Sequence, residues 1–151
     1  MKKESIIWIT RFFLDFMFFA GIMVTVTLPF SLKSKFVAKY FMPIADHYAE
    51  CVVIYFTLGI LAIAILGELR KMFRTVMKDN FFIFENVVSL QRMGTYSFMI
   101  SLVSLMRAII YLSPAMLVVI LVFIVAGLFS KVLAIVFDRA VKYKEENDLT
   151  I

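Results

Sequence analysis

The side chains that could bind a metal ion are few, and four of them lie close together. Asp46, His47, Glu50 and Cys51 follow one another at spacings that can place ligands on one face of a helix. No second cluster of such residues completes a site, and acidic residues in the first turns of a helix also suit the positive end of its dipole. We therefore expect no metal ion here, and the roles of His47 and Cys51 stay open.

Arg11 and Asp15 form a second candidate pair, because residues four apart lie on one face of a helix. The pair could be buried in a conduction or sensing path. It could instead lie at the membrane interface, one turn below the lipid headgroups, and we favour this interpretation. The single histidine has no recognisable nucleophile and base around it, and the sequence has no phosphate-binding loop. We expect no enzymatic activity and no cofactor.

The candidate residues described above lie in or beside long uncharged runs, so the folding of these runs must position them. The chain has 151 residues, 63% of them hydrophobic, and its mean hydropathy is +0.95. A soluble domain is nearer half apolar. Residue Ser113 before Pro114 divides the last apolar stretch, since a residue before proline leaves helical geometry. We predict an all-α integral membrane protein, a four-helix bundle of two transmembrane hairpins with spans over about 12–32, 46–67, 93–110 and 114–137.

The second helix should be longer than its span. Apolar residues continue at helical spacing beyond residue 67, which predicts a helix over 43–77 that ends at Lys78, Asp79 and Asn80. Such a helix is roughly 50 Å long, whereas the hydrocarbon layer is about 30 Å thick. Its end should project and present basic side chains, which could bind anionic lipid or an acidic partner: Arg70, Arg74 and Lys78 on one face, with Lys71 beside them.

Small residues recur along one face of the third span and one face of the fourth. Spans associate through close backbone approach and interhelical hydrogen bonds, because burying apolar surface gains nothing in lipid. We therefore predict that the two stripes pack together, and we call them the small-residue seam. Its members are Gly94, Ser97, Ser101, Ser104 and Ala108 in the third span and Ala126, Ser130 and Ala134 in the fourth.

The distribution of basic residues predicts the topology. Most of the 16 lysine and arginine residues lie in the N-terminal segment, in residues 68–92 and near the C-terminus, with Lys33, Lys35 and Lys39 on the other side. Cytoplasmic segments collect lysine and arginine. We expect both termini to be cytoplasmic, together with a central connection (residues 68–92) and a tail (residues 138–151). The same rule explains the net charge of +5 without direct nucleic-acid binding.

Two patches carry a family resemblance. The first holds Asn80, Phe82, Glu85, Asn86, Val87, Leu90, Arg92 and Gly94, with Phe81 at a position where proline is usual; the second is the ending Asp148, Leu149, Thr150 and Ile151. In these patches the chain resembles the bacterial domain-of-unknown-function family 2975 (DUF2975), which consists of small integral membrane proteins. The resemblance implies a four-span protein of the bacterial cell membrane. Family members are often encoded beside a small Cro/CI-type helix-turn-helix regulator, which implies a regulatory role.

Two functional hypotheses follow. In the first, the protein signals by holding or releasing a small cytoplasmic DNA-binding regulator, and contacts with it or with membrane lipids involve Arg70, Lys71, Arg74, Lys78, Asn80, Glu85, Asn86, Arg92, Asp148, Leu149, Thr150 and Ile151. In the second, the protein is a small transporter or channel that acts as a homo-oligomer. Arg11, Asp15 and Arg107 are its ionisable candidates, and their position near span ends argues against a midplane site. We expect Arg107 to reach the headgroups.

Overall fold

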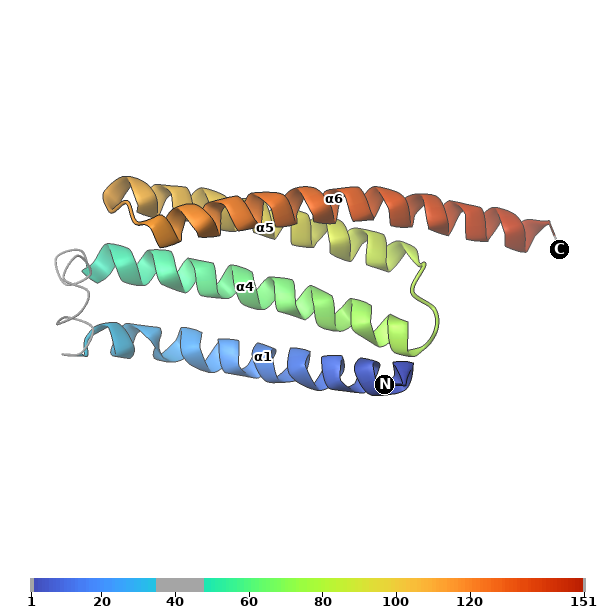
Figure 1. Ribbon diagram of the computed structural model, residues 1–151, viewed down its shortest axis with the longest axis horizontal. Helices are drawn as coiled ribbons and strands as arrows, with labels where there is room; N and C mark the ends of the chain where they lie inside the picture. Colours follow the sequence, from blue (N-terminus) through green and yellow to red (C-terminus); the bar gives the residue numbers. More distant parts are fainter. Residues whose placement is uncertain (1, 35–47, 151) are drawn as a thin grey trace.

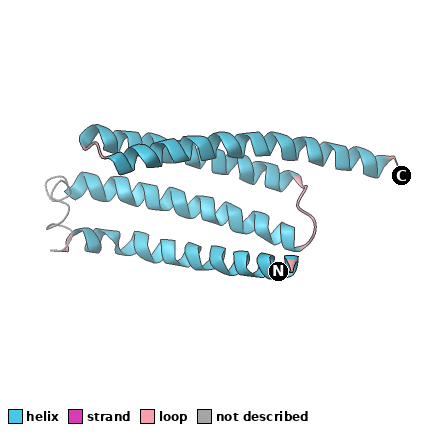
Figure 2. Cartoon of the chain, in the orientation of Figure 1, coloured by secondary structure: helices cyan, strands magenta, loops and turns pink. Residues whose placement is uncertain are grey.

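The computed structural model describes residues 2–34 and 48–150, which form four long helices and contain no strand (Figures 1 and 2). The all-α prediction is therefore confirmed. The helices are α1 (Lys3–Leu32), α4 (Tyr48–Met77), α5 (Phe84–Ile110) and α6 (Pro114–Leu149). Each of them is long and apolar enough to span a membrane. The predicted start of the second helix at Pro43, and with it Asp46 and His47, lies outside the described residues.

Both predicted helix breaks are confirmed, and each has a local cause. After α4, Asp79 adopts a φ of 53°, in the left-handed region that ends a helix. Before α6, the Ser113 side chain accepts a hydrogen bond from the backbone N–H of Met116 at 3.3 Å, and Pro114 occupies the first turn. This is the arrangement that favours a helix start, because proline lacks only an N–H that has no partner there.

The helices pack in chain order, and α5 lies at the centre. The most extensive interface joins α5 to α6, followed by those of α4 with α5 and α1 with α4. The number of buried residues decreases from α5 to α4 to α1. Helix α5 has twelve, α4 has Cys51 and Glu68, and α1 has only Thr25. Figure 1 shows α1 as the outermost helix, with α6 extending beyond the others at its C-terminal end. The large apolar side chains exposed on α1 are therefore available to lipid.

Close contacts join α1 to α4, and two of them lie toward the C-terminal end of α1. The Tyr48 hydroxyl donates to the Pro29 carbonyl at 2.7 Å, close to the C-terminal end of α1. Farther along, a Cβ atom at Gly59 would lie 2.5 Å from the Thr25 hydroxyl oxygen. Only glycine permits this approach, as is usual where membrane helices cross closely. The pair therefore rests on a few close contacts rather than on a broad buried face.

Candidate functional site

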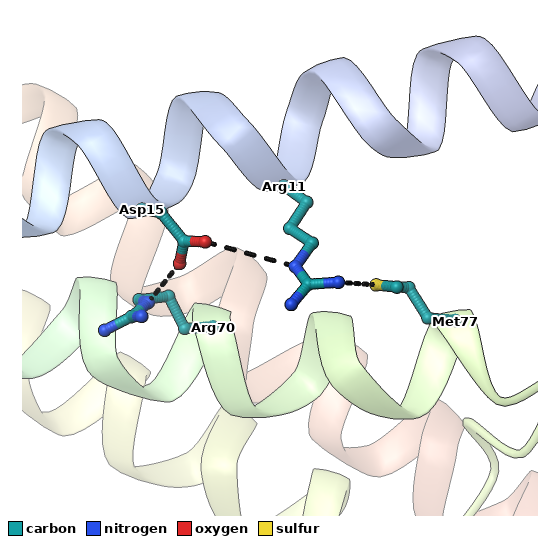
Figure 3. A network of polar contacts seen from close by, with 4 residues as sticks. All are labelled: Arg11, Asp15, Arg70 and Met77. Carbon is teal, nitrogen blue, oxygen red and sulfur yellow. Dashed lines mark hydrogen bonds and ion pairs between the residues drawn. The ribbon is translucent and has the colours of Figure 1, made fainter.

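Charged side chains of α1 and α4 meet in one network (Figure 3). Arg70 Nε donates to Asp15 Oδ1 at 2.7 Å, and Arg11 Nε lies 4.0 Å from Asp15 Oδ2. Arg11 Nη1 also reaches the sulfur of Met77 at 3.7 Å. Asp15 thus has a closer partner on α4 than the arginine four residues before it on α1. Arg70 of the predicted basic face therefore pairs with α1, and Arg74 lines the small cavity beside the pair.

The geometry around Arg70 shows that this network joins helices rather than holding a substrate. The guanidinium carbon of Arg70 lies 4.4 Å from the centre of the Phe18 ring, so the cation also packs on an aromatic face. The cavity beside the network measures about 40 Å³. That volume holds only a few water molecules. The Arg11–Asp15 pair is therefore one part of a connection between α1 and α4.

The central connection is held by a buried amide. Asn86 is 2% exposed, and its Nδ2 donates to Thr75 Oγ1 at 2.7 Å and to the Phe81 carbonyl at 2.6 Å. These bonds join the last turn of α4 and the turn after it to the start of α5. The prediction of a surface contact at Asn86 needs a correction, because its amide is used inside the protein. Asn80, by contrast, is exposed.

A buried carboxylate on α4 is a feature that sequence reasoning missed. Glu68 is 8% exposed, and its Oε1 lies 3.5 Å from Nη1 of Arg92 on α5. Its second oxygen, Oε2, is buried and has no hydrogen-bond partner among the described residues. Spacing along one helix could not reveal this pair, because its members come from two helices and are 24 residues apart.

A cleft opens between α4 and α5 beside this pair. Its volume is about 380 Å³, within the usual range of small-molecule sites. Three basic side chains and one carboxylate line it, together with hydroxyl, amide and apolar groups: Lys71, Arg74, Arg92, Glu85, Thr75, Ser89, Asn86, Phe84 and Val88. Five of the predicted contact residues thus share one cavity: Lys71, Arg74, Glu85, Asn86 and Arg92. Lys78 is exposed at the turn after α4.

The tail contacts the central connection. Lys144 Nζ donates to Asn80 Oδ1 at 2.8 Å, and the rings of Phe82 and Phe137 meet edge to face at 5.3 Å. The fourth span continues as a helix through most of the tail, because α6 runs to Leu149. Asp148, Leu149 and Thr150 are exposed at its end. Ile151 lies outside the described residues.

The small-residue seam lies on the packed side of α5. Its five members in α5 are buried, as are Ser130 and Ala134 in α6, whereas Ala126 is only half-buried. The buried position beside Ala126 is Gly127, where a Cβ atom would lie 2.8 Å from the Phe98 ring. The Ser101 hydroxyl donates to the Ile120 carbonyl of α6 at 3.3 Å. These contacts place the α5 stripe against α6, with Gly127 as an additional close-approach point.

The predicted spans contain two basic side chains, Arg107 and Lys131. Arg107 is 4% exposed, so the prediction that it reaches the headgroups is wrong. It follows Ser104 by three positions and therefore shares the packed face of α5. Lys131, which spacing did not single out, donates to the Gln91 carbonyl at 3.0 Å and to Thr95 Oγ1 at 2.9 Å. Its stem passes over Gly94, where a Cβ atom would come within 3.0 Å of it.

The described residues contain no group of three or more histidine, cysteine, aspartate and glutamate side chains that could hold a metal ion. Cys51 is buried, and Glu50 is exposed beside it. Asp46 and His47 lie outside the described residues.

Residues 26–151 match a family model described as "Protein of unknown function (DUF2975)". No curated protein and no solved structure matches the chain. The matched range includes α4, α5 and α6 with the cleft, the central connection and the tail. It begins after Arg11 and Asp15, so their network with Arg70 lies partly outside the family match.

Proposed function

The chain belongs to the DUF2975 family of proteins of unknown function, and we propose that it is a regulatory membrane protein that engages a cytoplasmic partner through its central connection and tail. The partner is a small helix-turn-helix DNA-binding regulator, the class that the family resemblance implies. Binding holds this regulator at the membrane, and release returns it to DNA. The excess of lysine and arginine at this end supports a cytoplasmic position.

One observation carries the proposal, namely that a side chain of the tail contacts a side chain of the connection. Lys144 and Asn80 come from segments 64 residues apart, yet their side chains hydrogen-bond at 2.8 Å. Figure 1 shows the end of α6 projecting past the turn between α4 and α5. A partner can therefore contact both segments at once, which increases the area available for binding.

Exposed apolar side chains on this surface give a partner its anchors. Phe84 is 63% exposed, Tyr143 is 72% exposed and Leu149 is 85% exposed. All three lie outside the predicted spans, so contact with the lipid chains does not account for their exposure. Large apolar and aromatic residues surrounded by charged ones are typical of protein interfaces. The neighbouring charged side chains, including the Lys142–Asp138 pair at 3.0 Å, supply a polar rim.

Regulation requires that the surface change with the state of the membrane domain. The broad α5–α6 interface joins α6 firmly to α5, whereas α4 packs on α5 through a smaller one. A signal that shifts α1 and α4 relative to α5 would move the connection against the tail and change the exposed contacts. Such a shift between two helix arrangements needs only a ligand or lipid that prefers one of them.

The alternative of a transporter or channel would need a continuous polar path. The buried hydroxyls of α5 are the nearest candidates, but two of them already donate hydrogen bonds to backbone carbonyls. Ser97 Oγ donates to the Met93 carbonyl at 2.9 Å, and Ser101 Oγ donates to α6. These bonds favour the regulatory proposal over a serine-lined path.

Deleting residues 138–151 tests the proposal in the organism of origin. We expect the deletion to change expression of the genes that the regulator controls, because the tail contributes half of the binding surface. The measurement is a transcriptome of wild-type and deleted strains in which both proteins reach the membrane in equal amounts. A Lys2→Gln/Lys3→Gln variant is the control, since it changes charges at the same end without touching the tail. Equal transcriptomes for all three strains contradict the proposal.

A further inference from the structure

We propose that the cleft between α4 and α5 binds a phosphate group, and that this phosphate belongs to an anionic lipid headgroup or to a free phosphate ion. The shared chemistry is a tetrahedral oxyanion held by lysine and arginine at the end of the spans. The inference goes beyond the proposed function, because it assigns a small-ligand site that needs no protein partner.

The charges of the cleft suit an anion. Lys71 and Arg74 reach it from α4 and Arg92 reaches it from α5, whereas Glu85 is the one carboxylate in its lining. Arginine presents parallel N–H groups that match two oxygens of a phosphate, and lysine adds a compact charge. The Arg92 side chain is 53% exposed while one of its terminal nitrogens faces Glu68 at 3.5 Å. Glu68 therefore orients this guanidinium and leaves its other N–H groups free for a ligand.

The first turn of α5 adds a second attraction. Phe84, Glu85 and Asn86 line the cleft, and the residue before them, Ile83, makes no side-chain capping hydrogen bond. The first N–H groups of a helix lack partners within it and carry the positive end of the helix dipole. Anions commonly occupy this position. Here the helix start and the three basic side chains border the same cavity.

The position of the cleft favours a lipid headgroup over a soluble anion. It lies between two helices that are apolar enough to span the membrane, near the end where the polar connection begins. Basic pockets between spanning helices at this level are typical sites for anionic headgroups. The volume of about 380 Å³ exceeds what a phosphate alone requires, and Val88 offers an apolar contact to the rest of a lipid.

Native mass spectrometry of the full chain in detergent, with phosphatidylglycerol or phosphatidylcholine added, tests the inference. The variant is Lys71→Gln/Arg74→Gln, which leaves the Glu68–Arg92 pair intact and changes two exposed side chains. The matched control is Lys2→Gln/Lys3→Gln, which removes two charges at the same end of the molecule. We expect wild type and control to retain phosphatidylglycerol in preference to phosphatidylcholine, and the variant to lose about tenfold or more of that preference.

A second arm separates the two sources of phosphate. Modification of Arg74 and Arg92 by phenylglyoxal is measured with inorganic phosphate or chloride at equal ionic strength. Protection by phosphate without a lipid preference assigns the site to free phosphate, and a lipid preference assigns it to a headgroup. The inference is overturned if neither phosphate nor phosphatidylglycerol distinguishes wild type from the Lys71→Gln/Arg74→Gln variant.

Discussion

Gly127→Leu is expected to lower the free energy of unfolding by about 1–3 kcal/mol, the usual cost of overpacking a close interface. A Cβ atom at this position would lie 2.8–3.0 Å from three atoms of the Phe98 ring. The Phe98 ring must therefore shift to admit a larger side chain at this position. Because α5 and α6 share the most extensive interface, the substitution should also loosen the link between the tail and the rest of the protein.

The measurement is the thermal unfolding midpoint in detergent. Leu128→Phe is the control, because the neighbouring side chain is exposed on the opposite side of the turn and enlarging it should leave the midpoint unchanged. The described packing of α6 on α5 is wrong at this point if both variants unfold at the wild-type temperature.

Asp15→Asn is expected to destabilise the protein by about 1–2 kcal/mol, between the values typical of exposed and of buried ion pairs. The side chains of Asp15 and Arg70 are 38% and 21% exposed, so solvent screens the pair only in part. Removing the carboxylate leaves Arg11 and Arg70 close together without the anion between them. The α1–α4 interface should weaken, since this network is one of its few polar links.

A double-mutant cycle isolates this interaction. Arg70→Gln alone and Asp15→Asn alone should each lower the unfolding midpoint, and the double variant should be more stable than the sum of the two effects predicts. Lys71→Gln is a suitable control, because Lys71 is exposed and does not line the cavity beside this network. Strictly additive effects would show that Asp15 and Arg70 do not interact in the folded protein.

The helices could be predicted from the sequence because each boundary has a local cause. Uncharged runs demand burial in lipid, and the chain must form helices there to satisfy its backbone. The polar residues at Lys78, Asp79 and Asn80 and the proline at position 114 then interrupt the helical pattern within one or two residues. The small-residue seam also follows from local spacing, because a helix places residues three and four apart on one face.

The charge pairing could not be predicted in the same way. Asp15 meets Arg70 and Glu68 meets Arg92 only because antiparallel helices bring these levels together, and no spacing within one helix encodes that register. Asparagine is usually exposed at the surface, whereas Asn86 is buried and its amide donates hydrogen bonds that hold the turn after α4. Arg107 carries a charge that favours water, yet it lies on the face of α5 that packs against other helices.

The central claim is that the connection and the tail bind one cytoplasmic regulator together, and site-specific photo-crosslinking in native membranes tests it most directly. A photoreactive residue replaces Phe84 at the start of α5, Tyr143 on the tail or, as the control, Ile109, which is 80% exposed near the other end of α5. The account predicts that Phe84 and Tyr143 capture the same small DNA-binding protein and that Ile109 does not. Capture of only lipids or membrane proteins from Phe84 and Tyr143, or of the same protein from all three positions, would contradict it.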